Sequence, residues 1–325
     1  MKIIATDGYT LNPGDNPWDR VAALGDFEVY DRTAPEDVLD RCQDADIVIV
    51  NKTPFSDSTL SRLTKLKFIS MSATGYDCVD IKSAGKRGIP VSNIPVYGTD
   101  TVAQYVFSAI LHLAHNISVH AEAVRQGEWS RAPDWCFWKL PLIELTGKTI
   151  GIVGFGRIGR RVGELAHAFG MEVLAFDVFK GAPPKYDNFR WCELDELFEL
   201  SDIVTLHSPL TEANQEFVNE RLLTKMKPTA FFINAARGGL VNEKDLAAAL
   251  VEGRLAGAVV DTVSAEPIRL DNPLLSAPHM FITPHMAWGT LAARKRMMSG
   301  IEDNIRSFIA GNAVNLVNAD HLNSK

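Results

Sequence analysis

The stretch TIGIVGFGRIG, from Thr149 to Gly159, decides the fold of this chain. It starts with an apolar run typical of a buried strand, and a glycine-rich turn then opens a helix predicted over Ile158–Phe169. In that context Gly154 allows the tight turn, Gly156 lets the backbone approach a pyrophosphate, and Gly159 lets the helix pack close to its strand. The helix N-terminus adds unpaired N–H groups and a partial positive charge, which suit phosphate groups.

An acidic residue follows the next predicted strand. That strand, Glu172–Phe176, is followed by Asp177, which lies 18 residues after Gly159. A carboxylate at about this spacing accepts hydrogen bonds from the adenine ribose hydroxyls and repels the 2′-phosphate of NADP. A chance turn with an unrelated surface acid is the weaker interpretation, because strand, turn, helix and acid occur together. We therefore predict a NAD(H) site formed by Gly154, Gly156, Arg157, Ile158, Gly159 and Asp177.

Short apolar runs alternate with helix-period segments along the chain, which predicts an α/β fold with parallel sheets. At 325 residues the chain is too long for one hydrophobic core, so we expect two domains. The predicted helices include Pro35–Cys42, Thr59–Leu66, a long helix capped by Asp100 and Thr101 that extends to Ile117, and a final helix over Thr290–Ala310. The further predicted strands are Lys2–Thr6, Asp46–Val50, Phe68–Met71, Ile89–Val91, Thr149–Val153, Ile203–Leu206, Ala230–Asn234, Ala258–Val260 and Met280–Thr283.

Composition and charge exclude several classes of function. The net charge of −7 gives no electrostatic reason to bind nucleic acid or an anionic membrane. No apolar run is long enough to span a membrane, and the N-terminal apolar run is too short for a secretory signal. The four cysteines are widely scattered, so we expect no disulfide framework and no metal site. A reducing cytoplasm is the expected compartment.

Residues 127–143 interrupt the alternation of strands and helices. The segment is rich in aromatic residues and has no clear periodicity, and a long irregular segment inside a compact enzyme is usually functional. The aromatic side chains could cover their own domain. We favour an arm that packs on a second subunit, because exposed aromatic clusters mark interfaces.

Three segments that follow predicted strands carry candidate catalytic groups. Arg237 precedes two glycines, and its planar guanidinium suits a carboxylate and a carbonyl together. His285 lies in a Pro-His turn and titrates in the range that proton transfer needs. Glu266 can favour the charged imidazolium and orient the ring. Each residue alone could be structural, such as an arginine that caps a helix. The joint order of strand–Arg, strand–Glu and strand–His points to catalysis.

With these motifs, the sequence resembles the D-isomer-specific 2-hydroxyacid dehydrogenase family over its whole length. The resemblance rests on GIVGFGRIG (151–159), HSPLT (207–211), NAARGGLVNE (234–243) and TPH (283–285). It implies that Arg237 orients and polarises a keto acid, that His285 is the general acid/base and that Glu266 is its partner. It also implies that Thr74, Gly75 and Tyr76 hold the substrate carboxylate through backbone N–H groups. The implied cofactor-lining residues are Thr101, His207, Pro209, Thr211, Ala235, Asp261 and His285.

The resemblance further implies two Rossmann-like domains, the cofactor domain being inserted in the substrate domain. The substrate domain would comprise residues 1–99 and 289–325, and the NAD-binding domain residues 100–288. The family places the active site in a cleft between the domains, and related enzymes form homodimers through the cofactor domain. Residues 7–15 and 134–138 resemble bacterial glycerate dehydrogenases and hydroxypyruvate reductases. The expected substrates are therefore hydroxypyruvate or glyoxylate, reduced to D-glycerate or glycolate.

Three other readings stay open. A D-lactate-type dehydrogenase differs mainly in pocket shape. A 3-phosphoglycerate dehydrogenase would need basic residues near the Thr74–Tyr76 loop, where Lys52 is the obvious candidate. NAD-sensing corepressors use the same fold as a binding module and retain the catalytic residues. Formate dehydrogenases also resemble the family, but they typically place glutamine at the position of Glu266.

Overall fold

The computed structural model describes residues 1–322 of the chain. It forms two compact units: Met1–Gly98 together with the segment from Gly289 onward, and Thr99–Trp288. No helix in residues 1–322 is both long enough and apolar enough to cross a membrane.

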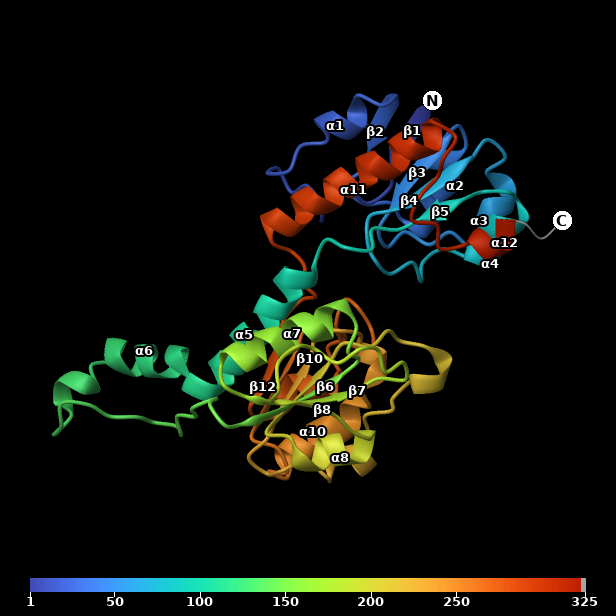
Figure 1. The fold of residues 1–325 in the computed structure, drawn as a ribbon. Coiled ribbons are helices and arrows are strands. Elements are labelled where there is room, and N and C mark those ends of the chain that lie inside the picture. The colour runs from blue at the N-terminus through green and yellow to red at the C-terminus, as the bar shows by residue number, and fades with distance from the viewer. Residues whose placement is uncertain (323–325) are drawn as a thin grey trace. The chain divides into compact units, whose positions relative to one another are not determined.

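The first unit is built on a parallel sheet of five strands in the order β2-β1-β3-β4-β5 (Figure 1). Its core lies between this sheet and the helices that connect the strands, and includes Phe55, Ile69 and Val91. The strands are β1 (Lys2–Ala5), β2 (Asp26–Val29), β3 (Ile47–Val50), β4 (Phe68–Met71) and β5 (Val91–Ser92). The helices are α1 (Asp19–Ala22), α2 (Val38–Cys42), α3 (Asp57–Arg62), α4 (Ile81–Lys86), α11 (Leu291–Ile309) and α12 (Ala319–Leu322).

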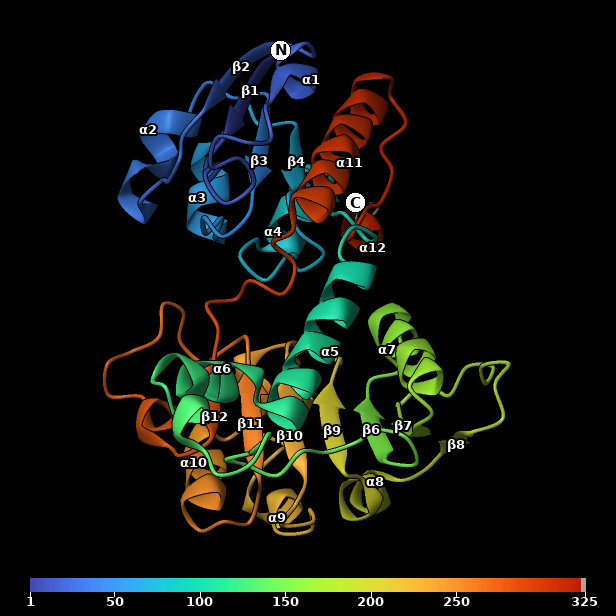
Figure 2. The same cartoon turned by 90° about the vertical axis from the view of Figure 1, so that its left-hand side faces the viewer.

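The second unit is built on a parallel sheet of seven strands in the order β12-β11-β10-β9-β6-β7-β8, which Figure 2 shows side by side. The strands are β6 (Thr149–Val153), β7 (Glu172–Phe176), β8 (Phe189–Trp191), β9 (Ile203–Leu206), β10 (Phe231–Asn234), β11 (Gly257–Val260) and β12 (Met280–Ile282). The helices are α5 (Thr99–His115), α6 (Ile117–Arg125), α7 (Arg157–Ala168), α8 (Leu194–Leu200), α9 (Glu220–Leu223) and α10 (Glu243–Val251).

Both faces of the second sheet are buried, so its strands are apolar on both sides. In strand β10, successive side chains point to opposite faces of the sheet. Phe231 and Ile233 pack with the helices α5 and α7, whereas Phe232 packs with α8, α9 and α10. The chain leaves β6 toward β7 and β8, then returns to build β9 to β12 on the other side. The reversal of strand order lies between β6 and β9, which is where doubly wound sheets bind their ligands.

Two strands were not predicted from the sequence. Strands β2 and β8 lie at the edges of the two sheets, and their burial is partial. Because each packs on few neighbours, neither shows the apolar run that marks the central strands. The strand predicted over Ile89–Val91 lies slightly later, at Val91–Ser92.

The prediction for the long helix at the start of the second unit was wrong at both ends. Helix α5 begins at Thr99, so Asp100 and Thr101 lie in its first turn and do not precede it as caps. It ends at His115, because Asn116 adopts a left-handed conformation with φ of 50°. Ile117 therefore starts a separate helix, α6, which extends away from the sheet of this unit (Figure 1).

Candidate active site

The strand register of the second sheet aligns the predicted site residues. Parallel pairing places Phe176, Val153, Leu206, Asn234, Val260 and Ile282 in one row across six neighbouring strands. Each of these residues ends or nearly ends its strand, so the residue after it lies at the carboxyl edge of the sheet. That next row consists of Asp177, Gly154, His207, Ala235, Asp261 and Thr283. One edge of one sheet thus gathers segments far apart in the sequence.

The glycine-rich turn follows β6. Gly154 has φ of +91°, and a Cβ there would lie 2.5 Å from the backbone nitrogen of Ser208 after β9. A Cβ at Gly159 would collide with the carbonyl oxygen of Gly154, so the helix can approach the turn only because this residue is glycine. At Gly156, the N-cap of α7, a Cβ would meet no atom within 4 Å. The open space lies at the positive end of α7.

The residues around this turn fit a dinucleotide. The hydroxyl of Ser208 is buried beside Gly154 and has no hydrogen-bond partner among residues 1–322. A buried hydroxyl without a partner is costly unless a ligand satisfies it. Together with the open helix N-terminus, it forms a place where phosphate oxygens would find donors.

Asp177 lies against the glycine-rich turn from the neighbouring strand. Its Oδ2 accepts the N–H of Phe155 at 2.7 Å, and its Oδ1 accepts the N–H of Phe179 at 3.0 Å. These bonds fix the carboxylate at the end of β7, next to the crevice between β6 and β9. The contact of Asp177 with the adenine ribose remains a prediction from the sequence.

His207 follows β9 and is half-buried. Loss of hydration lowers the pKa of its imidazole to about 3, so the ring is neutral at physiological pH. Its Nε2 is 3.0 Å from the hydroxyl of Thr205. A neutral ring here adds no charge to the crevice.

Three further residues predicted to contact the cofactor are arranged as follows. Pro209 and Thr211 lie on an exposed loop after β9, and the side chain of Asn214 pins that loop. Asn214 donates to the carbonyl of Pro209 at 2.8 Å and accepts the N–H of Thr211 at 2.7 Å. Thr101 is buried in the first turn of α5.

The loop that carries Arg237 follows β10, and the buried side chain of Asn234 holds it. Asn234 accepts the N–H of Ala236 at 3.0 Å and donates to the carbonyl of Arg237 at 2.9 Å. The guanidinium is partly buried, and its Nη1 donates to the carbonyl of Ala236 at 2.7 Å. The side-chain amide of Asn234 therefore fixes the backbone of this loop at two points.

His285 and Glu266 are in direct contact. Nδ1 of His285 is 2.8 Å from Oε2 of Glu266, and both side chains are about a quarter to a third exposed. The contact at Nδ1 leaves Nε2 as the nitrogen able to face a substrate. The structure therefore brings this predicted pair together with the geometry of an orienting carboxylate and an acid/base histidine.

Asp261 holds the loop on both sides of His285. Its Oδ1 accepts the hydroxyl of Thr283 at 2.6 Å and the N–H of Met286 at 2.8 Å, and its Oδ2 accepts the N–H of Ala287 at 2.8 Å. Burial raises the pKa of this carboxyl, and these hydrogen bonds oppose the rise. The resemblance places Asp261 among the cofactor-lining residues, and the hydrogen bonds of its carboxylate within the chain are with the loop that carries His285.

The loop predicted to hold the substrate carboxylate belongs to the first unit, after β4. Asn93 donates to the carbonyl of Thr74 at 2.7 Å, and the hydroxyl of Thr74 donates to the carbonyl of Ile94 at 2.8 Å. Gly75 is partly buried and Tyr76 is exposed. The anchored start of the loop leaves Gly75 and Tyr76 at its tip.

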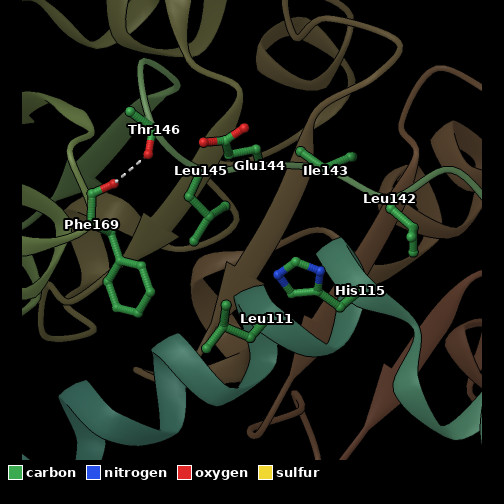
Figure 3. Close-up of a pocket in the computed structure, with 8 residues that line it drawn as sticks. All are labelled: Leu111, His115, Leu142, Ile143, Glu144, Leu145, Thr146 and Phe169. Atoms are coloured by element: carbon green, nitrogen blue, oxygen red, sulfur yellow. Dashed lines mark hydrogen bonds between the residues drawn. The ribbon is translucent and has the colours of Figure 1, made fainter.

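A hollow of about 390 Å³ lies elsewhere in the second unit (Figure 3). Leu111 and His115 of α5 line it, with Phe169 at the end of α7 and the segment from Leu142 to Thr146. These residues precede β6 and follow α7, so the hollow lies at the amino edge of the sheet, opposite the catalytic loops. It adjoins the base of the aromatic segment 127–143 and is no part of the candidate active site.

Two positioning residues were missed from the sequence. Asn234 and Asn214 each hold a functional loop through two backbone contacts, and only the first fell within a motif that the sequence singled out. An asparagine at the end of an apolar strand, such as Asn234, is a usable signal, because its side chain readily bonds nearby backbone. Among residues 1–322 no cluster of His, Cys, Asp or Glu is arranged to hold a metal ion.

The chain is similar to known proteins in sequence and in fold. The family model for the NAD binding domain of D-isomer specific 2-hydroxyacid dehydrogenases matches residues 107–287, more than half of the chain. A hydroxypyruvate reductase of Blautia hydrogenotrophica is 46% identical over 98% of this chain and 100% of that protein. A glycerate dehydrogenase of Methylorubrum extorquens is 38% identical, covering 90% and 92%. The solved structure of an acyclic imino acid reductase with NADPH and D-Arg superposes with a TM-score of 0.85 at 30% identity, covering 98% and 100%.

Proposed function

The chain belongs to the D-isomer-specific 2-hydroxyacid dehydrogenase family, whose members are NAD-dependent oxidoreductases acting on CH–OH groups, and we propose that it reduces hydroxypyruvate to D-glycerate. The observation that carries the chemistry is the contact between His285 and Glu266 at the carboxyl edge of the nucleotide-binding sheet. This contact pairs a proton donor with an orienting carboxylate beside the predicted coenzyme site.

The residues divide the reaction between them. When bound, NADH supplies a hydride to the C2 carbonyl carbon of the keto acid. Arg237 binds the carboxylate and the carbonyl oxygen with its planar fork and polarises that carbonyl. His285 delivers a proton from Nε2 to the oxygen, while Glu266 stabilises the imidazolium that precedes the transfer. The backbone N–H groups of Gly75 and Tyr76 hold the carboxylate end of the substrate.

The coenzyme site follows the same logic. The N-terminus of α7, with Gly156, Arg157 and Ile158, would bind the pyrophosphate, and Asp177 would accept hydrogen bonds from the adenine ribose. A solved relative holds NADPH, so the fold alone does not choose between the coenzymes. We assign the choice to Asp177, because its carboxylate would repel a 2′-phosphate. The remaining lining residues are Thr101, His207, Pro209, Thr211, Ala235 and Asp261.

The names of two relatives favour hydroxypyruvate, and a substrate panel tests this assignment. Purified protein is assayed with NADH against hydroxypyruvate, glyoxylate, pyruvate and 3-phosphohydroxypyruvate. We expect the highest kcat/KM with hydroxypyruvate, followed by glyoxylate. A preference for pyruvate or for the phosphorylated acid would favour the lactate or phosphoglycerate alternatives. Tight NADH binding with slow turnover of every keto acid would instead indicate a NAD-sensing binding module.

We also propose a homodimer, formed through the second unit. The segment 127–143 exposes Trp135 and Trp138, of which 86% and 67% of the surface is accessible. The apolar hollow at the base of this segment offers a complementary surface (Figure 3). Large exposed apolar groups of this kind are typical of interfaces. The four cysteines are free, which fits a reducing cytoplasm as the working compartment.

A further inference from the structure

The loop that carries Glu266 is held at two points by one carboxylate. This loop runs from the end of β11 to Asn272, which caps the short helix that begins at Pro273. Glu243 is the first residue of α10 and lies under the loop. Its Oε1 accepts the N–H of Ser264 at 2.7 Å, and its Oε2 accepts the hydroxyl of Ser264 at 2.7 Å and the side-chain N–H of Asn272 at 2.8 Å.

The same loop also touches the segment that carries Arg237. A Cβ at Gly238 would collide with the carbonyl group of Val263, so the two loops cross in direct contact. Gly238 lies one residue after Arg237, and Val263 lies three residues before Glu266. The arginine loop therefore packs against one side of the Glu266 loop and limits where that loop can lie.

We propose that Glu243 is a positioning residue for the reaction, acting through Glu266. By fixing Ser264, two residues before Glu266, and Asn272 at the far end, it sets where the Glu266 carboxylate meets Nδ1 of His285. Between these anchors the loop is exposed: Leu270 is 99% accessible, and Arg269 pairs with its near neighbour Asp271. This inference rests on the proposed roles of His285 and Glu266.

The chemistry of the site requires a carboxylate. All three groups that approach Glu243 are donors: a backbone N–H, a hydroxyl and an amide N–H. A carboxylate accepts at both oxygens, whereas a glutamine would turn an NH₂ group toward at least one of these donors. Glu243→Gln therefore keeps the size of the side chain and breaks part of the clamp. Ser264→Ala is a milder change that removes only the hydroxyl contact.

The test compares Glu243→Gln with Asp245→Asn in the full-length protein. Asp245 lies in the same helical turn, but its Oδ2 accepts the N–H of Glu220, far along the chain from the catalytic loop. Both variants lose one negative charge from the start of α10. We expect Glu243→Gln to lower kcat about tenfold or more, because small displacements of catalytic groups are costly. The KM for NADH of Glu243→Gln should stay within about twofold of the wild-type value. The kcat of Ser264→Ala should lie between those of Glu243→Gln and the wild type. The kcat of Asp245→Asn should match that of the wild type.

A double-variant cycle separates positioning from general loss of structure. If Glu243 acts through Glu266, adding Glu243→Gln to Glu266→Gln should change kcat by less than about twofold. Multiplicative losses in the double variant, or an unchanged kcat in Glu243→Gln, would overturn the inference while leaving the proposed function standing. An unchanged kcat in Glu266→Gln would remove the proposed catalytic pair and this inference with it.

Discussion

The backbone N–H of His285 donates to the backbone carbonyl of Asp261 at 2.8 Å. This bond fixes the backbone of the candidate catalytic residue to the residue that follows strand β11. His285 has φ of 53°, a left-handed conformation that non-glycine residues seldom adopt. The carboxylate of Asp261 takes the N–H groups of Met286 and Ala287 as well. A strained conformation that its surroundings over-determine is typical of functional sites.

Replacing His285 by alanine should slow keto-acid reduction about 10²–10⁴-fold, the usual contribution of a general acid/base. NADH binding, measured by fluorescence titration, should stay nearly unchanged. His279→Ala provides the control, because His279 has φ of 54° but precedes β12, at the other end of the same strand. Both variants place alanine in the left-handed region, so a loss of kcat confined to His285→Ala is chemical. Equal kcat values in the two variants would exclude His285 from proton transfer.

Asp177→Ala should weaken NADH binding about 10- to 100-fold, the range for hydrogen bonds to a charged group. The kcat/KM ratio of NADH to NADPH should narrow, because the repulsion of the 2′-phosphate disappears. Asp187→Ala is the control, since Asp187 is an exposed acid on the segment between β7 and β8. A coenzyme ratio that stays at the wild-type value in Asp177→Ala would contradict the assignment.

Arg237→Lys should lower kcat/KM for the keto acid by one to several orders of magnitude, because an ammonium cannot reproduce the planar fork. Affinity for oxamate, a mimic of the keto acid, should fall in parallel. Arg221→Lys tests general effects of this exchange, since Arg221 binds the carboxylate of Asp195 on the surface. Wild-type affinity for oxamate in Arg237→Lys would show that the guanidinium does not bind the substrate.

The central strands and the glycine-rich turn could be predicted because burial on both faces leaves continuous apolar runs between turns. The edge strands β2 and β8 escaped prediction because their exposed faces carry no such run. Helix α5 was extended too far because apolar spacing continues past Asn116, where a left-handed residue turns the backbone. An apolar pattern indicates which face is buried, but local backbone geometry decides where a helix ends.

For the site, the residue types and their order after the strands predicted the pairing of Glu266 with His285. The residues that hold these loops were harder to find. Glu243 and Asn234 act on segments through backbone and side-chain contacts that depend on the path of each loop. Sequence spacing does not encode such paths. The start of α10 and the loop after β11 are brought together only in the folded chain.

His207 should make the protein less stable in mild acid. Its pKa is lowered to about 3 in the folded chain, against about 6.5 when unfolded, so between these values the unfolded chain binds the extra proton. The contribution of His207 to the free energy of unfolding should therefore fall as the pH decreases through this window, with a limiting slope of about 1 kcal/mol per pH unit. Glutamine at position 207 cannot titrate. The free energy of unfolding of His207→Gln, measured by urea unfolding, should therefore fall less between pH 7 and pH 4 than that of the wild type. His279→Gln is the control at an exposed position, and parallel curves for wild type and His207→Gln would contradict the burial of a neutral ring.

The final prediction concerns Trp135 and Trp138 on the aromatic segment. Within that segment, Nε1 of Trp129 donates to the carbonyl of Trp135 at 3.0 Å, and Lys139 pairs with Glu128 at 2.7 Å, so the segment is held in shape while both tryptophan rings stay exposed. Burying two such rings, at about 200 Å² each and about 25 cal/mol per Å², corresponds to a gross gain of about 10 kcal/mol. That gain is similar to the cost of association, so their loss should shift the equilibrium decisively.

Light scattering should therefore give the wild type twice the 35.8 kDa mass of the chain, and the double variant Trp135→Ser, Trp138→Ser the mass of one chain. Phe179→Ser controls for the loss of an exposed aromatic ring, because Phe179 is 81% accessible but lies outside this segment. It should leave the mass of the dimer unchanged. A wild type that is monomeric at assay concentrations, or a double variant that stays dimeric, would rule out the aromatic segment as the contact between subunits.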